Sequence, residues 1–197
     1  MATVRKTGAV ALCGAVPLAL LLAGCGGGGG DAKPSETAPA ASTPAPAPAS
    51  SSAAPVDPDA AEKRAVLASY SSMWVEQMKA YGKASAKGTR LSKYAALDAL
   101  SKFEVDLSHM KKNGTVIRGE LGHDAKVSGL DLDGKLPKAT IQDCVDLSKW
   151  QTLDTRTDKP IPLPSTQPLR YVATARAEKW PGGWMVTDYI PDGKHTC

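Results

Sequence analysis

Apolar residues recur at every third or fourth position in two stretches of the chain, and this spacing predicts two amphipathic helices. The first stretch begins at Asp57-Pro58-Asp59, a typical helix start, and ends near Gly82. The second runs from about Ser92 to Lys112 and ends at Asn113-Gly114, a typical helix C-terminus. The expected apolar stripes consist of Leu67, Tyr70, Trp74, Met78 and Tyr81 in the first helix and Leu97, Leu100, Phe103, Leu107 and Met110 in the second.

Beyond Gly114 the apolar period falls to two, which is typical of β-strands. We expect five strands at 115–121, 125–132, 138–145, 169–178 and 184–190, with turns at 133–134 and 181–183. The stretch 146–168 contains four Pro residues and is expected to be a long polar loop. Helices followed by strands predict an α+β domain over residues 58–197, with the N-terminal helices packed on an antiparallel β-sheet.

The first 25 residues have the pattern of an export signal. A basic start is followed by an apolar run over 9–23, shorter than the roughly 20 residues of a membrane span. The run ends in Leu22-Ala23-Gly24-Cys25, which resembles the bacterial lipobox. The resemblance implies that residues 1–24 are a signal peptide and that Cys25 receives a diacylglyceryl group, with fatty-acid chains such as palmitate. The alternative is a plain secretory signal that happens to contain a cysteine.

Residues 25–57 are rich in Gly, Pro, Ala and Ser and have almost no large apolar side chains. Such a segment cannot bury enough surface to offset the entropy of ordering, so we expect a disordered linker. With two acyl chains on Cys25, the mature protein is expected to stay anchored to the extracytoplasmic face of the cell membrane. The linker then acts as a spacer between the membrane and the domain.

The cysteines support the same compartment. Of four Cys residues, Cys13 leaves with the signal and Cys25 carries the lipid. Cys144 and Cys197 remain, and in an oxidising compartment two remaining thiols predict a disulfide. The alternatives are two free thiols or a metal site that includes His195, whose spacing from Cys197 matches no known ligand pattern. We therefore expect no metal and no cofactor.

The formal net charge of +4 is mildly basic. A nucleic-acid-binding protein usually gathers Lys and Arg on one face with aromatic residues between them, and the sequence has no such run. We therefore expect no nucleic-acid partner.

The order of elements resembles a known superfamily. Two helices, a strand meander and a closing Gly-Gly-Trp-Met-Val hairpin are similar to the nuclear-transport-factor-like (cystatin-like) cone fold. The strand 139–146, of sequence ATIQDCVD, together with Cys197 resembles secreted actinobacterial lipoproteins and Mce-associated proteins of that superfamily. The resemblance covers about residues 58–197. It implies a curved sheet around an internal pocket, and it implies no particular activity.

Two acidic residues are candidate general bases, because isomerases and cyclases of this fold use an Asp or His inside the cone. Alternation places Asp143 on one face with Ile141 and Val145, and Asp188 on one face with Trp184 and Val186. A desolvated carboxylate has a raised pKa, which suits a base. The alternatives are a one-residue slip of a strand, which reverses its faces, or pairing of the acids with Arg170, Arg176 or a backbone amide.

The remaining polar and aromatic candidates are weaker. The three His residues have no ligand or catalytic spacing and are expected to be solvated: His109, His123 and His195. Trp150 and Trp180 border loops, so they could face a partner.

Taken together, the sequence favours a non-catalytic binding or assembly module of the cell envelope, which engages an envelope protein or a small apolar ligand through the cone. The first alternative is an isomerase-like or cyclase-like enzyme that uses Asp143 or Asp188. The second is a structural domain that forms a homodimer through its open sheet.

Overall fold

The computed structural model describes residues 57–197. The predicted signal peptide, the lipidation site at Cys25 and the linker up to residue 56 lie outside the described residues. No helix within 57–197 is long and apolar enough to cross a membrane.

Helix α1 (Ala60–Tyr81) confirms the first predicted helix. Its N-cap is Asp59 instead of Asp57, and the Asp57 carboxylate accepts a hydrogen bond from the Asp59 N–H at 2.9 Å. The buried side of the helix includes Tyr70, Trp74 and Tyr81 of the expected stripe. It also includes a carboxylate and an amide, Glu76 and Gln77, which the apolar period does not reveal.

The second predicted helix begins too early. Helix α2 (Leu97–Asn113) starts at Leu97, and the residues before it form a short 3-10 helix, η1 (Leu91–Lys93), and an extended segment. That segment pairs with the edge of the sheet, since the Ala96 N–H donates to the Val186 carbonyl at 2.9 Å. Sheet pairing thus takes backbone groups that a longer helix would need. The predicted C-terminal cap is confirmed, with Gly114 left-handed at φ 67°.

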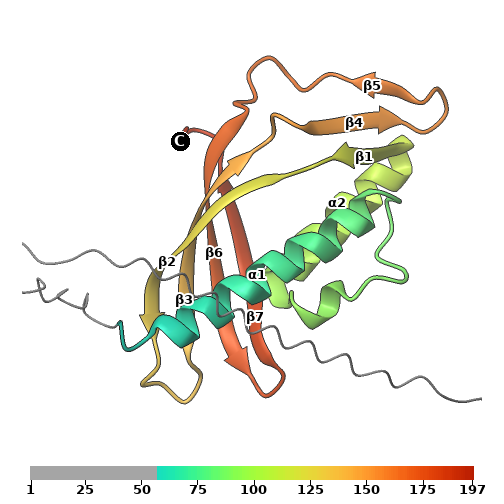
Figure 1. Ribbon diagram of the computed structural model, residues 1–197. Helices are drawn as coiled ribbons and strands as arrows, with labels where there is room; N and C mark the ends of the chain where they lie inside the picture. The colour runs from blue at the N-terminus through green and yellow to red at the C-terminus, as the bar shows by residue number, and fades with distance from the viewer. Residues whose placement is uncertain (1–56) are drawn as a thin grey trace, which may run out of the picture. The chain divides into compact units, whose positions relative to one another are not determined.

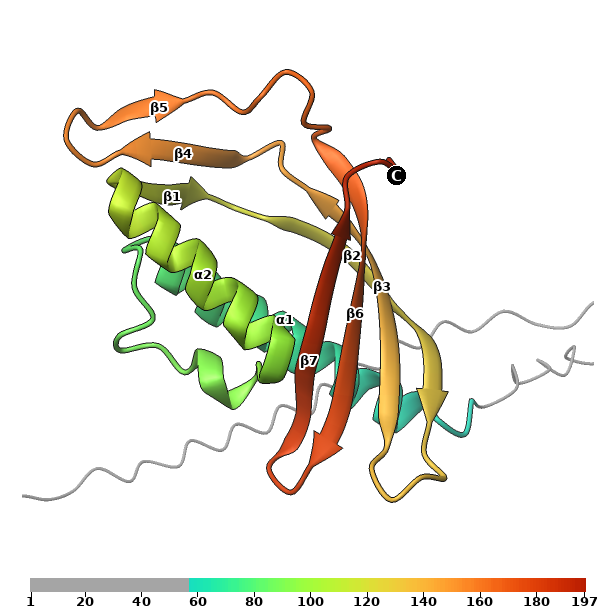
Figure 2. The ribbon, with the colours of Figure 1, turned by 180° about the vertical axis from the view of Figure 1, so that it is seen from behind.

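Seven strands form two antiparallel sheets within residues 57–197, instead of the five expected. The larger sheet has the order β2-β3-β6-β7 and the smaller one β1-β4-β5. Their bounds are β1 (Thr115–Gly119), β2 (Gly122–Asp131), β3 (Lys138–Asp146), β4 (Trp150–Asp154), β5 (Lys159–Ile161), β6 (Arg170–Trp180) and β7 (Gly183–Asp192). The strands curve around the two helices, which lie along the concave side (Figures 1 and 2). The α+β class with helices packed on a curved antiparallel sheet is therefore confirmed.

The prediction of a loop over 146–168 is wrong, because β4 and β5 lie within it. β4 pairs with β1, and β5 pairs with β4 as an edge strand. Pro160 can sit in β5 because a proline on an edge strand loses no hydrogen bond inside the sheet. The prolines suggested a loop, and no local pattern in the sequence indicates that these strands pair with distant partners.

The larger sheet passes into the smaller one at a sharp bend between β1 and β2 and between β3 and β4. At this bend Gly119 has a φ of 83°, and a Cβ there would lie 1.8 Å from the Lys149 carbonyl oxygen. Glycine is therefore required at position 119, because the backbone here lies very close to the segment that contains Lys149. The bend carries β1, β4 and β5 over the C-terminal ends of α1 and α2 (Figure 1).

Candidate functional site

The alternation predicted for the third strand is confirmed, and it brings a carboxylate into the core. Ile141 and Val145 are fully buried, and Asp143 between them is 2% exposed. The Tyr70 hydroxyl donates to Asp143 Oδ2 at 2.9 Å, and His123 Nδ1 lies 2.6 Å from the same oxygen. The other carboxylate oxygen, Oδ1, is buried and has no hydrogen-bond partner among the described residues. Neither Arg170 nor Arg176 pairs with Asp143, so the expectation of an arginine partner is wrong for this acid.

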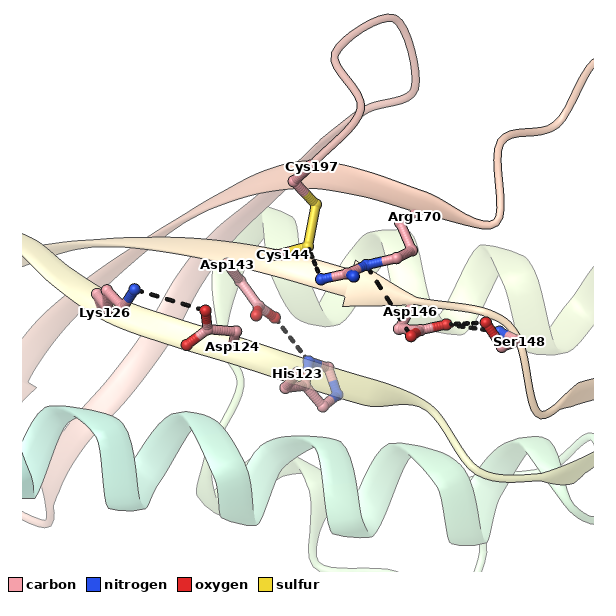
Figure 3. Close-up of a disulfide and its surroundings, with 9 residues drawn as sticks. All are labelled: His123, Asp124, Lys126, Asp143, Cys144, Asp146, Ser148, Arg170 and Cys197. Atoms are coloured by element: carbon pink, nitrogen blue, oxygen red, sulfur yellow. Dashed lines mark hydrogen bonds and ion pairs between the residues drawn. A yellow bond between two sulfur atoms is a disulfide. The ribbon is translucent and has the colours of Figure 1, made fainter.

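The prediction that His123 is a solvated side chain is wrong. The residue lies on the edge strand β2, where its backbone is open to solvent, but its side chain is only 22% exposed. The imidazole faces Asp143 from the neighbouring strand (Figure 3). Its ring centroid lies 5.1 Å from that of Trp74 and 6.0 Å from that of Tyr70. The β2–β3 register pairs Ala125 with Asp143, which places His123 diagonally opposite, and only this pairing reveals the contact.

The tyrosines near this site remain protonated. Burial, followed by the negative charge of Asp143, raises the pKa of Tyr70 above its ordinary value. Burial and the neighbouring Tyr171 and Tyr70 hydroxyls raise the pKa of Tyr189 in the same direction. Tyr70 is therefore a hydrogen-bond donor, and Asp143 is the acceptor that joins it to His123.

The second candidate, Asp188, is not in this site. A bulge at Thr187 shifts the register between β6 and β7, so that Val186 and Thr187 are both buried in succession. This is the one-residue reversal of faces left open above. Asp188 consequently borders a separate cleft beside the start of α2 and pairs with Lys102 at 2.7 Å. Its carboxylate also accepts the Tyr189 backbone N–H at 2.8 Å, so the expected backbone-amide partner is present for this acid. The two acids do not form a pair.

An open cavity of about 410 Å³ lies between the helices and the bend of the sheet. Its walls are mainly aromatic and aliphatic: Trp74, Tyr81, Phe103, Leu121, Leu147, Trp150, Leu163, Tyr171, Tyr189 and Pro191. Polar groups come from Lys102, Asp106 and Gln167. Trp74 and Leu121 also border a groove that His123 lines, so these two residues separate the imidazole from the cavity. Of the two uncertain Trp residues, Trp150 lines the cavity and Trp180 does not.

The disulfide predicted between Cys144 and Cys197 is present, with a Cα–Cα distance of 5.9 Å. Cys144 follows Asp143 on β3 and therefore points to the opposite side of the strand (Figure 3). The bond holds the C-terminal segment against the sheet, where the Val172 N–H also donates to the His195 carbonyl at 2.9 Å.

The other histidines behave as expected. His109 is exposed on α2, and His195 is exposed and contacts Asp192. Within residues 57–197 no three His, Cys, Asp or Glu side chains are grouped so that they could hold a metal ion.

No protein-family model matches the chain, and no curated protein matches its sequence. Among solved structures, the intermembrane space region of the chloroplast protein ARC6 is similar to it over 66% of this chain and 96% of that one. The two share 13% sequence identity, and the TM-score is 0.45.

Proposed function

We propose that the domain binds a small, largely apolar molecule in the aromatic cavity, and that a lipid on Cys25 tethers it to the outer face of the cell membrane. The observation that carries the binding proposal is the open, aromatic-lined cavity at the bend of the sheet. A domain that served only as a structural element would gain stability by filling this space.

The size and lining of the cavity indicate the class of ligand. A volume of about 410 Å³ lies within the range of small-molecule sites, which are on the order of 300–1,000 Å³. The charged groups at its border already have partners. Lys102 binds Asp188 at 2.7 Å, and Asp106 accepts a hydrogen bond from the Tyr81 hydroxyl at 2.8 Å. An uncharged ligand therefore fits better than an ionic one, which would have to displace these contacts.

The tether is proposed from the sequence. The basic start, the short apolar run and Leu22-Ala23-Gly24-Cys25 together support export and lipidation, and the disulfide agrees with an oxidising compartment. The nuclear-transport-factor-like superfamily, in its secreted actinobacterial branch, remains our proposed relationship. Helices on the concave side of a curved sheet agree with it.

The His123–Asp143 pair supports a second candidate function, proton transfer of the isomerase or cyclase type. In the tautomer in which Nδ1–H donates a hydrogen bond to Asp143, the lone pair of Nε2 is free to take a proton from a substrate. Nε2 has no hydrogen-bond partner within 57–197, and the ring borders a groove with Trp74 and Leu121. The Tyr70 hydroxyl donates to the same carboxylate oxygen and helps to hold Asp143 in place.

Ligand binding can be tested with N-phenyl-1-naphthylamine, an uncharged apolar dye that becomes fluorescent in apolar sites. We expect saturable binding to one site. Leu163→Trp, on the cavity wall, should weaken binding at least tenfold, whereas Leu169→Trp, which is 52% exposed and does not line the cavity, should leave it unchanged. Equal binding by the two variants, with unchanged circular dichroism, would contradict the proposal.

Proton transfer can be tested with 5-nitrobenzisoxazole, an apolar substrate that reports a general base. The base removes the ring C–H proton, the N–O bond breaks, and a coloured cyanophenolate forms. His123→Gln and Asp143→Asn should each lower the rate at least tenfold, while His109→Gln should have no effect. Rates equal to that of the wild type in all three variants would contradict the proposal of proton transfer by His123 and Asp143.

The anchor can be tested by fractionating cells that express the full chain. Cys25→Ser should release the protein or leave its precursor uncut, and Cys13→Ser should not. A Cys25→Ser protein that stayed fully processed and membrane-bound would contradict lipidation at this residue.

A further inference from the structure

Two hairpin tips lie side by side at the end of the domain where α1 begins (Figure 1). The β2–β3 and β6–β7 turns are adjacent because β3 pairs with β6, and Lys138 lies opposite Glu178. The Lys179 N–H donates to the Pro137 carbonyl at 2.9 Å, which joins the two tips. Glu62, in the first turn of α1, binds Lys179 at 2.7 Å and thereby joins the start of the helix to them.

The tips carry apolar side chains that are not part of the protein core. Leu132 is 37% exposed and Leu136 is 38% exposed, and both flank the turn of the first hairpin. Trp180 is half-buried beside the second turn, where Pro181 is exposed. The Trp180 indole N–H donates to Glu178 at 3.1 Å, so its polar edge already has a partner. We call these four residues the tip surface.

We propose that the tip surface rests in the interface of the phospholipid bilayer to which the protein is tethered. This inference rests on the proposed lipid at Cys25. The chain outside the structure joins the domain at Asp57, at the start of α1, and therefore at the same end as the tips. The 31 residues 26–56 link that point to Cys25, so this is the end of the domain that the lipid tethers. In this proposal the linker is a tether that lets the tips reach the bilayer, instead of a spacer that holds the domain away from it.

The chemistry of the tips fits a bilayer interface. Trp and Leu are suited to that depth, because an indole has an apolar body and a polar edge. The two hairpins carry three cations and three acids at the tips, Lys135, Lys138 and Lys179 with Asp131, Asp133 and Glu178, and Glu62 of α1 adds a fourth acid. With no excess of positive charge, contact depends on the apolar side chains and needs no anionic lipid.

This orientation has a consequence for the cavity. β7 runs from the tip at Gly183 to Asp192, and Pro191 lines the cavity near the far end of the strand. β4, which begins at Trp150, lies at the opposite end of the domain from the tips (Figure 1), and Trp150 lines the cavity as well. The cavity thus lies away from the bilayer, and ligand reaches it from the aqueous side.

The test uses the full-length lipidated protein in phosphatidylcholine vesicles that contain acyl chains brominated near the headgroup, which quench nearby Trp. We expect quenching of the wild type that Trp180→Phe abolishes and Trp150→Phe leaves unchanged. Leu132→Asp combined with Leu136→Asp should reduce quenching at least fivefold. The matched control is Val105→Asp with Leu169→Asp, two residues that are 52% exposed and belong to neither tip.

The outcomes separate the two proposals. Vesicle-bound protein without Trp180 quenching would overturn the tip surface and leave the anchor intact. Quenching that Trp150→Phe abolishes would overturn it as well, because the opposite end would then face the lipid. Wild-type protein that does not stay with the vesicles would instead contradict the anchor itself.

Discussion

The Tyr70 hydroxyl, in the middle of α1, donates a 2.9 Å hydrogen bond to Asp143 on β3, which lies 73 residues further along the chain. This contact joins the helix layer to the sheet inside the core, at a carboxylate that is 2% exposed. His123 completes the network from the edge strand. Both donors depend on one acceptor, so the network should respond strongly to its loss.

Asp143→Ala should reduce the free energy of unfolding by about 1–3 kcal/mol, because it leaves the buried Tyr70 hydroxyl without an acceptor. Urea denaturation measures this change. Asp124→Ala, on the neighbouring strand and exposed to solvent, is the control and should have little effect. Adding Tyr70→Phe to Asp143→Ala should cost less than the sum of the two single changes, and a strictly additive result would show that the contact contributes nothing.

Removal of the Cys144–Cys197 disulfide should destabilise the domain by about 4 kcal/mol, given a sequence separation of 53 residues and the chain-entropy relation. The comparison is urea denaturation of the oxidised protein and of a Cys144→Ser and Cys197→Ser double variant. Reductant should lower the urea midpoint of the wild type and leave that of the double variant unchanged. A wild-type midpoint that does not respond to full reduction would contradict the expected role of the bond.

Glu76 should make the stability of the domain depend on pH in the acidic range. The Arg90 N–H and the Lys79 ammonium, each 2.8 Å from the carboxylate, hold its pKa at about 2, below the ordinary 4.5. Because the folded state favours the charged form, this stability is complete above about pH 4.5 and is lost as the pH falls toward 2. Glu76→Gln should lower the melting temperature at pH 7. The melting temperature of this variant should also fall less than that of the wild type between about pH 4.5 and pH 2.

Glu104→Gln is the control for that experiment, since Glu104 is exposed on α2. Its melting curve should follow that of the wild type across the same pH range. An identical acid dependence for Glu76→Gln and wild type would mean that other carboxylates govern the transition.

Gly119→Ala should destabilise the bend by about 1–3 kcal/mol, because it combines a left-handed backbone with a Cβ placed 1.8 Å from the Lys149 carbonyl oxygen. Thermal unfolding monitored by circular dichroism gives the shift. Gly182→Ala, where no atom lies within 4 Å of the added Cβ, should change the melting temperature little. Similar shifts for both substitutions would show that the bend tolerates a side chain.

Features that depend on the local spacing of apolar residues, or on the number of residues of one type, could be predicted from the sequence. It predicted α1 almost to the residue, the Gly114 cap, the β6–β7 hairpin and the inward face of β3 with Asp143. It also predicted the Cys144–Cys197 pair, because only these two cysteines lie in the folded domain. Each of these follows from a few neighbouring residues or from the chemistry of one residue type.

Features that depend on which strands pair could be seen only in the folded structure. Register across β2 and β3 brought His123 to Asp143, and a bulge at Thr187 turned Asp188 away from the site. Residues 150–154 form a strand because they pair with β1, which is distant in the sequence. The residues before Leu97 are not helical because they pair with the edge strand β7. The alternation of apolar and polar residues determines which side of a strand each residue occupies. Hydrogen bonds to a distant partner determine where that strand begins, bulges and bends, and therefore which side chains come into contact.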